Sequence, residues 1–221
     1  MMQVTPVNPR EPKPARIEAA AKVLRAGGVV ALPTETFYGL AVDSSRGNAV
    51  ARLNRLKVKD DDSPVLLLAA DMAQVERVSS APPPSFAVLA RAFWPGPLTL
   101  VLAAAPGLSS QVTAGRGTVA VRVPGLALPR MLAEALGNPV TGVSANLHSR
   151  RAPRTAGEVA ESFPEGIDLL LDGGPTPGGG PSTLVDLTGT KPRVLRRGLV
   201  LEAALRNFVP DLQSAPAQSA L

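Results

Sequence analysis

The sequence predicts a mixed α/β protein, an open twisted sheet flanked by helices. Short apolar runs of strand length alternate with segments whose apolar side chains recur every three or four residues. Several runs are joined by connections shorter than the roughly ten to twelve residues that a parallel crossover needs, which favours a mixed sheet. The 20 glycines and 23 prolines fall between these runs, where they mark turns.

The first part of the chain predicts a helix, two strands and a second helix. Residues 17–26 have helical apolar spacing and end at two glycines. The apolar run 28–32 is a strand that a proline stops. A short strand at 39–43 follows, and then a helix at 48–56 with two lysines just past its end.

The remaining elements follow from the same two periodicities. Apolar runs predict strands, and apolar spacing of three to four residues predicts helices. The expected strands are 65–69, 98–103, 118–123, 140–143, 167–171 and 183–187, with a short final pair at 194–197 and 199–201. The expected helices are 72–78, 85–93, 128–136 and 158–162, with a short helix after residue 201.

No repeat and no linker divides the chain, so we expect a single domain over residues 15–209. Residues 1–14 are rich in proline, and residues 210–221 are rich in alanine, serine and glutamine. We expect both of these ends to be flexible.

The composition narrows the classes of chemistry. The chain has no cysteine and only one histidine, His148, which excludes thiol nucleophiles and makes a histidine triad or a histidine-built metal site unexpected. We expect no metal site made by the protein itself. The formal charge of +5 favours anionic partners such as nucleotides or RNA. Neither a signal-peptide core nor an apolar run of about 18 residues occurs, so we expect a cytoplasmic protein without membrane contact.

Residues 33–40, with the sequence PTETFYGL, are the most informative segment. A buried strand ends there in two threonines, a glutamate and a glycine, the kind of loop that presents a ligand site in α/β sheets. Lys57 and Lys59 follow shortly before the next strand and suggest a neighbouring anion such as a phosphate. The plainer alternatives are a turn with helix-capping residues and a solvated basic surface beside the acidic run 60–62.

Arg122 stands in the middle of an apolar strand, where an unpaired charge would be expensive to bury. One alternative is a structural ion pair with Glu35 or Asp43. The other is a bidentate grip on the carboxylate of a ligand.

Polar side chains follow several other expected strands. Ser144 and Asn146 come after the run 140–143, Arg154 lies further on, Ser182 precedes a strand, and Arg196 ends one. The turn from Phe93 to Thr99 is interpreted as a rigid structural connection. No GxxxxGK[ST] segment occurs, so a nucleotide would have to be held by something other than a P-loop.

Together these segments resemble the YrdC/TsaC family, the threonylcarbamoyl-AMP synthases. The motifs occur in the family's order over roughly residues 17–201. They are PTET-x-YGL (33–40), K-x-[RK] with a following proline (57–64), WPGPLT (94–99), R-x-P (122–124), SAN (144–146), PST with a later aspartate (181–186) and LR-x-G (195–198). The resemblance implies a YrdC-like fold with a deep, positively charged cavity, in the short single-domain form.

The resemblance also implies a nucleotidyltransferase reaction. L-threonine, bicarbonate and ATP would give threonylcarbamoyl-AMP and pyrophosphate, and Mg²⁺ would accompany the ATP. The product would serve t6A formation at adenosine 37 of tRNA through downstream transferase proteins. Positioned cations suffice for such a phosphoryl transfer, because negative charge collects on the phosphoryl oxygens and the departing pyrophosphate.

Carried over to this chain, the family's motifs imply two groups of site residues. The L-threonine group is Thr36, Arg122, Ser144 and Ser182, with Arg122 on the carboxylate. The ATP group is Lys57, Lys59, Ser63, Thr118, Asn146, Arg154 and Arg196, and Lys57 and Lys59 would also be catalytic.

Several positions depart from the family pattern. Lys59 replaces a usual arginine, Ser63 a usual asparagine and Leu68 a frequent histidine, and Arg154 is an unusual side chain at its position. Two alternatives therefore stay open. One is a diverged relative that acts on another carbamoyl substrate, and the other is a non-catalytic protein that binds tRNA or double-stranded RNA.

Overall fold

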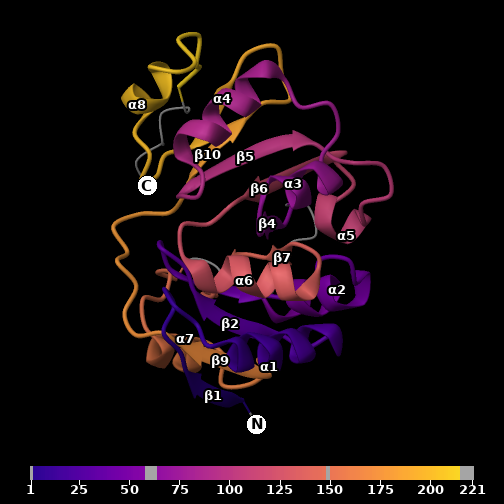
Figure 1. Cartoon of the computed structure of the whole chain (residues 1–221), viewed down its shortest axis with the longest axis vertical. Coiled ribbons are helices and arrows are strands. Elements are labelled where there is room, and N and C mark those ends of the chain that lie inside the picture. Colours follow the sequence, from indigo (N-terminus) through magenta and orange to yellow (C-terminus); the bar gives the residue numbers. More distant parts are fainter. Residues whose placement is uncertain (1, 58–63, 148–149, 215–221) are drawn as a thin grey trace.

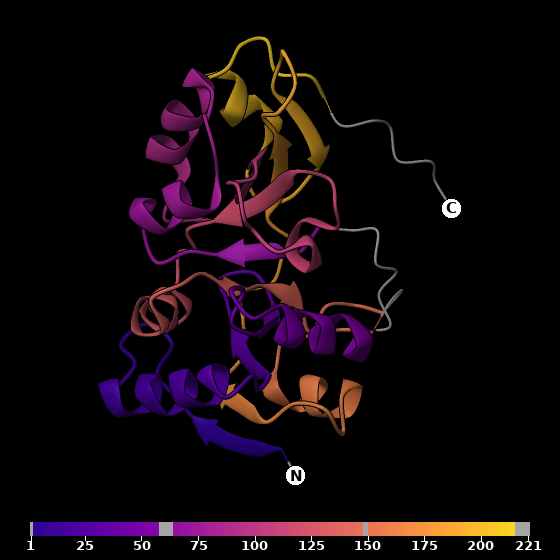
Figure 2. The ribbon, with the colours of Figure 1, turned by 90° about the vertical axis from the view of Figure 1, so that its right-hand side faces the viewer.

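The computed structural model describes residues 2–57, 64–147 and 150–214. Its strands form one five-stranded and one six-stranded sheet, both of mixed direction. In Figures 1 and 2 the five-stranded sheet occupies the lower half of the molecule and the six-stranded sheet the upper half. The predicted mixed α/β class is confirmed, with two hydrogen-bonded sheets where one was expected.

The five-stranded sheet is parallel at one edge and antiparallel at the other. In spatial order it contains β1 (Gln3–Pro6), β9 (Leu169–Asp172), β2 (Val30–Pro33), β3 (Tyr38–Ala41) and β8 (Val143–Ser144). Every residue of β2 and β3 is buried. Their sequences are therefore continuous apolar runs and do not alternate, as is typical of strands covered on both faces.

The six-stranded sheet pairs β10 with β5 and β4 with β6 in parallel, and its other neighbours are antiparallel. In spatial order it contains β11 (Arg193–Arg196), β10 (Thr183–Asp186), β5 (Leu98–Ala103), β6 (Thr118–Arg122), β4 (Leu66–Leu68) and β7 (Val140–Thr141). This order brings the ends of β5, β6, β10 and β11 to one region.

The helices lie around and between the sheets (Figure 1). They are α1 (Pro14–Arg25), α2 (Gly47–Leu56), α3 (Met72–Val78), α4 (Pro84–Phe93), α5 (Ser110–Thr113), α6 (Ala127–Leu136), α7 (Ala156–Ser162) and α8 (Glu202–Arg206). Helix α1 begins at a proline, which suits the first helical position, and has basic residues in its last turn. Its buried Ala20 and Ala21 allow close packing, and Arg25 donates a hydrogen bond to Ala135 O of α6 at 2.6 Å.

The hydrophobic core spans both sheets. Helix α6 joins them, because Leu128 and Leu132 pack in one cluster with Leu32 of β2 and Leu68 of β4. Both leucines of α6 are fully buried, and burial of such a side chain stabilises the fold by about 1.5–3 kcal/mol. The two halves of the molecule therefore share a core.

The chain passes between the two sheets from β3 to β4, again at residues 140–144, and a third time at residues 173–182, here called the crossover segment (orange in Figure 1). The passage at 140–144 was expected to be one strand. It is two strands of two residues each, because β7 pairs with β4 while β8 pairs with β3. Between them Gly142 N donates to Leu66 O at 2.8 Å.

Parts of both chain ends, which were expected to be flexible, pair with strands or are buried. Within residues 1–14, Gln3–Pro6 form β1, which is parallel to β9. Within residues 210–221, Leu212 is buried and Gln213 bridges Arg193 of β11. Residues 199–201, expected as a strand, are irregular and lead into α8.

In the described ranges, every helix is too short or too polar to cross a lipid bilayer.

Candidate active site

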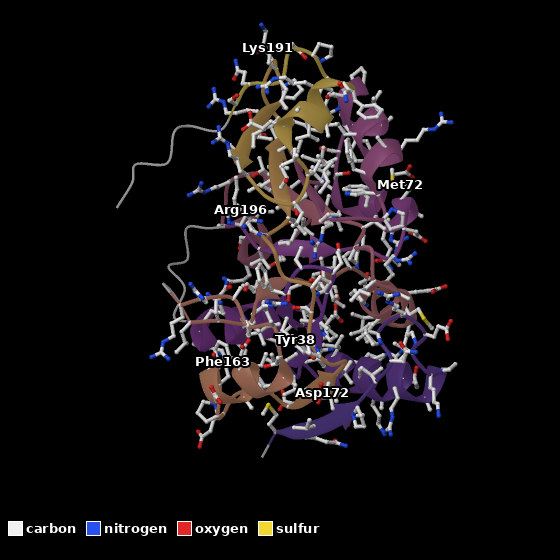
Figure 3. All side chains as sticks on the ribbon, turned by 90° about the vertical axis from the view of Figure 1, so that its left-hand side faces the viewer. Tyr38, Met72, Phe163, Asp172, Lys191 and Arg196 are labelled. Atoms are coloured by element: carbon white, nitrogen blue, oxygen red, sulfur yellow. The ribbon has the colours of Figure 1, made fainter. Side chains whose placement is uncertain are left out.

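A cavity of about 510 Å³ lies where the two sheets meet. Strands β3 and β8 contribute to it from one sheet, and β5, β6, β10 and β11 from the other. In Figure 3, Tyr38 lies in the lower half and Arg196 in the upper half, and both residues line the cavity. The volume falls in the range of small-molecule sites, roughly 300–1,000 Å³. Six predicted site residues line this cavity: Thr36, Arg122, Ser144, Asn146, Ser182 and Arg196.

The loop of residues 34–37 follows β2 directly, and its Thr36 lines the cavity. Thr34 Oγ1 donates to Phe37 O at 2.8 Å and also lies 2.8 Å from Thr36 Oγ1. Because a hydroxyl has one hydrogen, Thr36 is the donor in the second contact. The lone pairs of Thr36 Oγ1 are left to accept hydrogen bonds from a ligand.

Arg122 is buried at the end of β6, with a side chain only 3% exposed. Its Nη1 lies 3.5 Å from Glu35 Oε1, which is an ion pair but too long for a good hydrogen bond. Among the described residues, Arg122 Nε and both carboxylate oxygens of Glu35 are buried without a hydrogen-bond partner. The ion pair with Glu35, which was one of the alternatives, therefore exists, and it leaves Arg122 Nε without a hydrogen-bond partner among the described residues.

Two arginines concentrate positive charge at the cavity. Burial lowers the pKa of Arg122 below its usual value, and the Glu35 carboxylate opposes that shift. Arg196 is exposed as a whole residue, yet desolvation of its guanidinium and the charge of Arg122 lower its pKa as well. Arginine keeps its proton in proteins, so both groups stay cationic and favour an anion between them.

Arg196 is anchored by Ser182. Its Nη2 donates to Ser182 Oγ at 3.1 Å, and its Nε and Nη2 donate to Ser182 O at 3.3 and 3.1 Å. The Ser182 hydroxyl also lies 2.8 Å from Thr99 Oγ1. A Cβ at Gly198 would come within 2.3 Å of Pro181 O, so a glycine there lets the chain after Arg196 approach this backbone. Three strands thus converge on one polar corner of the cavity.

The segment after β8 forms another wall. Ser144 Oγ is buried without a hydrogen-bond partner among the described residues. Lys57 Nζ, from the end of α2, donates to Ser144 O at 2.6 Å and also to Asn146 O. The Asn146 amide donates to Leu147 O at 3.0 Å and Arg150 O at 2.6 Å, so its side-chain oxygen is the atom left for a ligand. Lys57 therefore supports the backbone of this segment and is not itself among the residues that line the cavity.

Two other predicted site residues that the structure describes, Thr118 and Arg154, are not among those that line the cavity. Thr118 begins β6 opposite Ala103 and is not part of the cavity lining. Arg154 was expected near ATP, but its guanidinium donates to Thr176 O and Pro177 O of the crossover segment. Lys59 and Ser63 fall outside the described residues.

Two cavity features escaped the sequence-based interpretation. Thr99 lines the cavity and contacts Ser182, although its turn was interpreted as structural. Thr34 also lines it. Both are hydroxyl residues at the ends of buried strands. The same sequence pattern identified Thr36 and Ser144, and applying that pattern to every strand would have identified Thr34 and Thr99 as well.

The described residues contain no group of three or more histidine, cysteine, aspartate or glutamate side chains that could hold a metal.

The comparisons with known proteins agree with this architecture. The Sua5/YciO/YrdC family model, described as "Telomere recombination", matches residues 22–198. Threonylcarbamoyl-AMP synthase of Pyrococcus abyssi is 37% identical over 202 residues, which are 91% of this chain and 59% of that protein. The synthase of the same name from Halorhodospira halophila is 40% identical over 161 residues, 73% of this chain and 84% of that one.

Solved structures give the same result. P. abyssi Sua5 complexed with L-threonine superposes with a TM-score of 0.92 at 35% identity, covering 97% of this chain and 63% of that one. YciO of E. coli superposes with a TM-score of 0.84 at 26% identity, covering 93% of this chain and all of that one. The chain spans somewhat more than half the length of its P. abyssi and Bacillus subtilis relatives. On the family match and these relatives, the chain belongs to the Sua5/YciO/YrdC family.

Proposed function

We propose that this protein is an L-threonylcarbamoyladenylate synthase, a nucleotidyltransferase that makes threonylcarbamoyl-AMP and pyrophosphate from L-threonine, bicarbonate and ATP. The observation that carries the proposal is the buried Arg122, which lines a cavity of suitable size and whose Nε has no hydrogen-bond partner among the described residues. The names of the relatives and the L-threonine complex of P. abyssi Sua5 support the choice of substrate.

The amino acid would bind at the Arg122 end of the cavity. Arg122 would take the carboxylate through two parallel N–H groups, the geometry in which arginine binds carboxylates best. Ser144 Oγ, unpartnered among the described residues, and Thr36 Oγ1, with free lone pairs, lie in the same lining and would contact the amine and hydroxyl. A buried hydroxyl without a partner is unfavourable, so a ligand that supplies one gains affinity.

The triphosphate would lie along the remaining cations. Arg196 and Arg150 line the cavity and would make this part of it electropositive. The side-chain oxygen of Asn146 can only accept a hydrogen bond, so it would contact a donor of the nucleotide such as an amino or hydroxyl group, with Lys57 holding the backbone of this segment in place. Lys59, Ser63, Thr118 and Arg154 remain candidates for ATP contacts from the family pattern alone. Mg²⁺ would arrive with ATP, ligated by phosphate oxygens and water.

The chemistry needs positioning and charge more than a protein nucleophile. The threonine nitrogen forms a bond to the bicarbonate carbon and hydroxide leaves as water, which gives a carbamate. A carbamate oxygen then attacks the α-phosphorus of ATP, and the bond from that phosphorus to the bridging oxygen breaks. Pyrophosphate carries away the electron pair. Arginine side chains fixed at the phosphates stabilise this developing charge without reorganisation.

The adenylate would be consumed by a transferase that moves the threonylcarbamoyl group to adenosine 37 of tRNA. The partners of the protein would therefore be ATP, L-threonine, bicarbonate and the downstream t6A machinery. RNA contact remains part of the proposal through the basic residues near the cavity, such as Arg150 and Arg151.

Pyrophosphate release from ATP tests the proposal. We expect release to require both L-threonine and bicarbonate, with the adenylate identified by mass spectrometry. Equal release without threonine would contradict the proposed reaction, and a preference for another amino acid in the same assay would identify a diverged relative. Binding of RNA that falls steeply with salt, without any pyrophosphate release, would favour the non-catalytic alternative.

A further inference from the structure

We propose that Glu35 is a specificity-determining residue that sets the charge of the amino-acid subsite through its ion pair with Arg122. With Glu35 in place, the subsite accepts one carboxylate and disfavours a ligand that carries a second negative charge. This inference rests on the proposed threonine-dependent function.

The position of Glu35 is unusual for an acidic residue. It lies in the short loop between β2 and β3, and its side-chain oxygens are buried without hydrogen bonds among the described residues. A Cβ added at Gly125 would lie 3.6 Å from Glu35 Cγ and Cδ, so Gly125 borders the Glu35 side chain closely. The carboxylate lies 3.5 Å from Arg122 Nη1.

Glu35 acts on the cavity through Arg122. Arg122 lines the cavity, whereas Glu35 is not part of the lining. Glu35 is therefore a positioning residue, and its effect on a ligand is electrostatic. An ion pair that stabilises the fold is expected to have its donors and acceptors hydrogen-bonded. Here Arg122 Nε and both carboxylate oxygens of Glu35 have no hydrogen-bond partner among the described residues. Stabilisation of the fold is therefore a poor explanation of this pair.

The balance of charge at this end of the cavity explains what Glu35 contributes. Arg122 and Arg196 bring two positive charges, close enough for the charge of Arg122 to act on Arg196. Glu35 offsets the charge of Arg122, and the other cationic residues of the lining, Arg196 and Arg150, are those assigned to the triphosphate. A second carboxylate on the amino-acid ligand would therefore be repelled by Glu35 at the Arg122 end of the cavity. Neutralising Glu35 should therefore relax this discrimination.

L-aspartate and L-asparagine provide the probes, because they have nearly the same shape and differ by one negative charge. Their affinities would be measured by calorimetric competition with L-threonine in the absence of ATP. In Glu35→Gln we expect the ratio of aspartate to asparagine affinity to rise about tenfold, the effect of removing one nearby like charge in a partly desolvated site.

Three variants control for shape and folding. Glu35→Asp keeps the charge and should keep the wild-type ratio. Glu18→Gln removes another arginine-paired carboxylate, on the exposed surface of α1, and should leave both affinities unchanged. Glu35→Ser also removes the charge and should raise the ratio as Glu35→Gln does. It therefore carries the test if thermal unfolding shows that Glu35→Gln does not fold.

The outcomes separate this inference from the proposed function. A wild-type protein that binds no L-threonine contradicts the proposed function. An unchanged ratio in folded Glu35→Gln, or in Glu35→Ser where Glu35→Gln does not fold, overturns the role of Glu35 while leaving the reaction intact. An equal loss of aspartate and asparagine affinity also overturns it, because the effect would then be on the shared amine or on packing. A ratio in Glu35→Asp as high as in Glu35→Gln would attribute the effect to shape.

Discussion

Two arginines of this protein are used in opposite ways. Arg122 is buried, yet among the described residues its Nε has no hydrogen-bond partner and its carboxylate neighbour is 3.5 Å away. Arg154 is exposed, yet its guanidinium makes three hydrogen bonds to the carbonyl oxygens of Thr176 and Pro177. An exposed arginine could be satisfied by water, whereas a buried one could not. The unpaired Nε of Arg122 therefore indicates a ligand site, whereas the paired guanidinium of Arg154 indicates a structural role.

The same contrast separates the two regions in which these arginines lie. The Arg122 region contains unpartnered buried atoms of Glu35 and Ser144 as well. In the first part of the crossover segment, residues 173–178, the only such atom among the described residues is Thr176 Oγ1, and the backbone makes many hydrogen bonds. Tyr38 Oη donates to Gly174 O at 2.8 Å and accepts from Gly173 N at 3.2 Å, and Gly178 N donates to Thr36 O at 3.1 Å. The Arg122 region is therefore suited to bind a ligand, whereas residues 173–178 hold the wall beside Thr36 and Tyr38 in place.

Substitution of Arg122 should give the largest functional effect. Arg122→Lys keeps the charge but loses the two parallel N–H groups. We expect kcat/KM for L-threonine to fall by about 100-fold, since one charge-assisted hydrogen bond contributes about 1.5–3 kcal/mol. Steady-state pyrophosphate release at varied threonine measures this.

The matched control for Arg122→Lys is Arg154→Lys. If Arg154 serves structure, KM for both substrates should stay within about threefold of the wild type, since exposed polar changes away from a site alter stability by about 0.5 kcal/mol or less. A large rise in KM for ATP in Arg154→Lys would break the contrast and return Arg154 to the ATP site of the family pattern.

The pH dependence of stability tests whether the Tyr38 hydroxyl holds the crossover segment. Burial raises the pKa of the Tyr38 hydroxyl to about 12. The folded-state pKa lies above the unfolded value of about 10. The contribution of the Tyr38 hydroxyl to the free energy of unfolding is therefore complete below pH 10 and is lost as the pH rises towards 12. Between these two values the wild type should lose about 2 kcal/mol of stability through this group.

Urea unfolding at pH 9 and at pH 11.5, compared between the wild type and Tyr38→Phe, measures this loss. The phenylalanine variant should be less stable at pH 9, since the bonds to Gly173 and Gly174 are gone. It should also lose less stability on going to high pH. Equal losses in the two proteins would mean that the hydroxyl contributes nothing to holding the crossover segment.

The sequence alone anticipated much of the fold, and the reasons are local. Helix α3 and strand β5 lie where expected, at 72–78 and 98–103, because each has clear ends. Asp71 caps α3 through Gln74 N, and a proline-rich turn precedes β5. The division into two sheets was not predictable, because it depends on which distant strands pair. Strand β1 was missed for the same reason, since its partner β9 lies more than 160 residues away.

The site shows the same limit. Hydroxyl and cationic residues at strand ends were found from the sequence, because strand ends meet at one edge of a sheet. The direction of the Arg154 side chain was not, since it depends on the path of the crossover segment some 22 residues later in the chain. The unmatched state of Arg122 and Glu35 was equally hidden. A sequence can suggest that two charges meet but not whether their hydrogen bonds are satisfied.

The smallest expected effect gives the most specific test of the crossover segment. Gly178 and Gly174 both adopt left-handed backbone conformations, with φ of +67° and +75°. A Cβ at Gly178 would lie 2.7 Å from Arg154 Nε, whereas at Gly174 it would meet nothing within 4 Å. Gly→Ala at either position carries the same conformational penalty, about 1 kcal/mol. The difference between the two variants therefore isolates contact with the Arg154 guanidinium.

We expect Gly178→Ala to be less stable than Gly174→Ala by about 1 kcal/mol, because the alanine displaces the guanidinium from its carbonyl acceptors. Chemical denaturation of both variants, in the wild-type and Arg154→Gln backgrounds, measures this. In the Arg154→Gln background the difference should disappear. If it persists, the strain belongs to the backbone of the crossover segment itself, and the bonds of Arg154 do not hold that segment. The comparison of the two arginines would then rest on the observations at Arg122 alone.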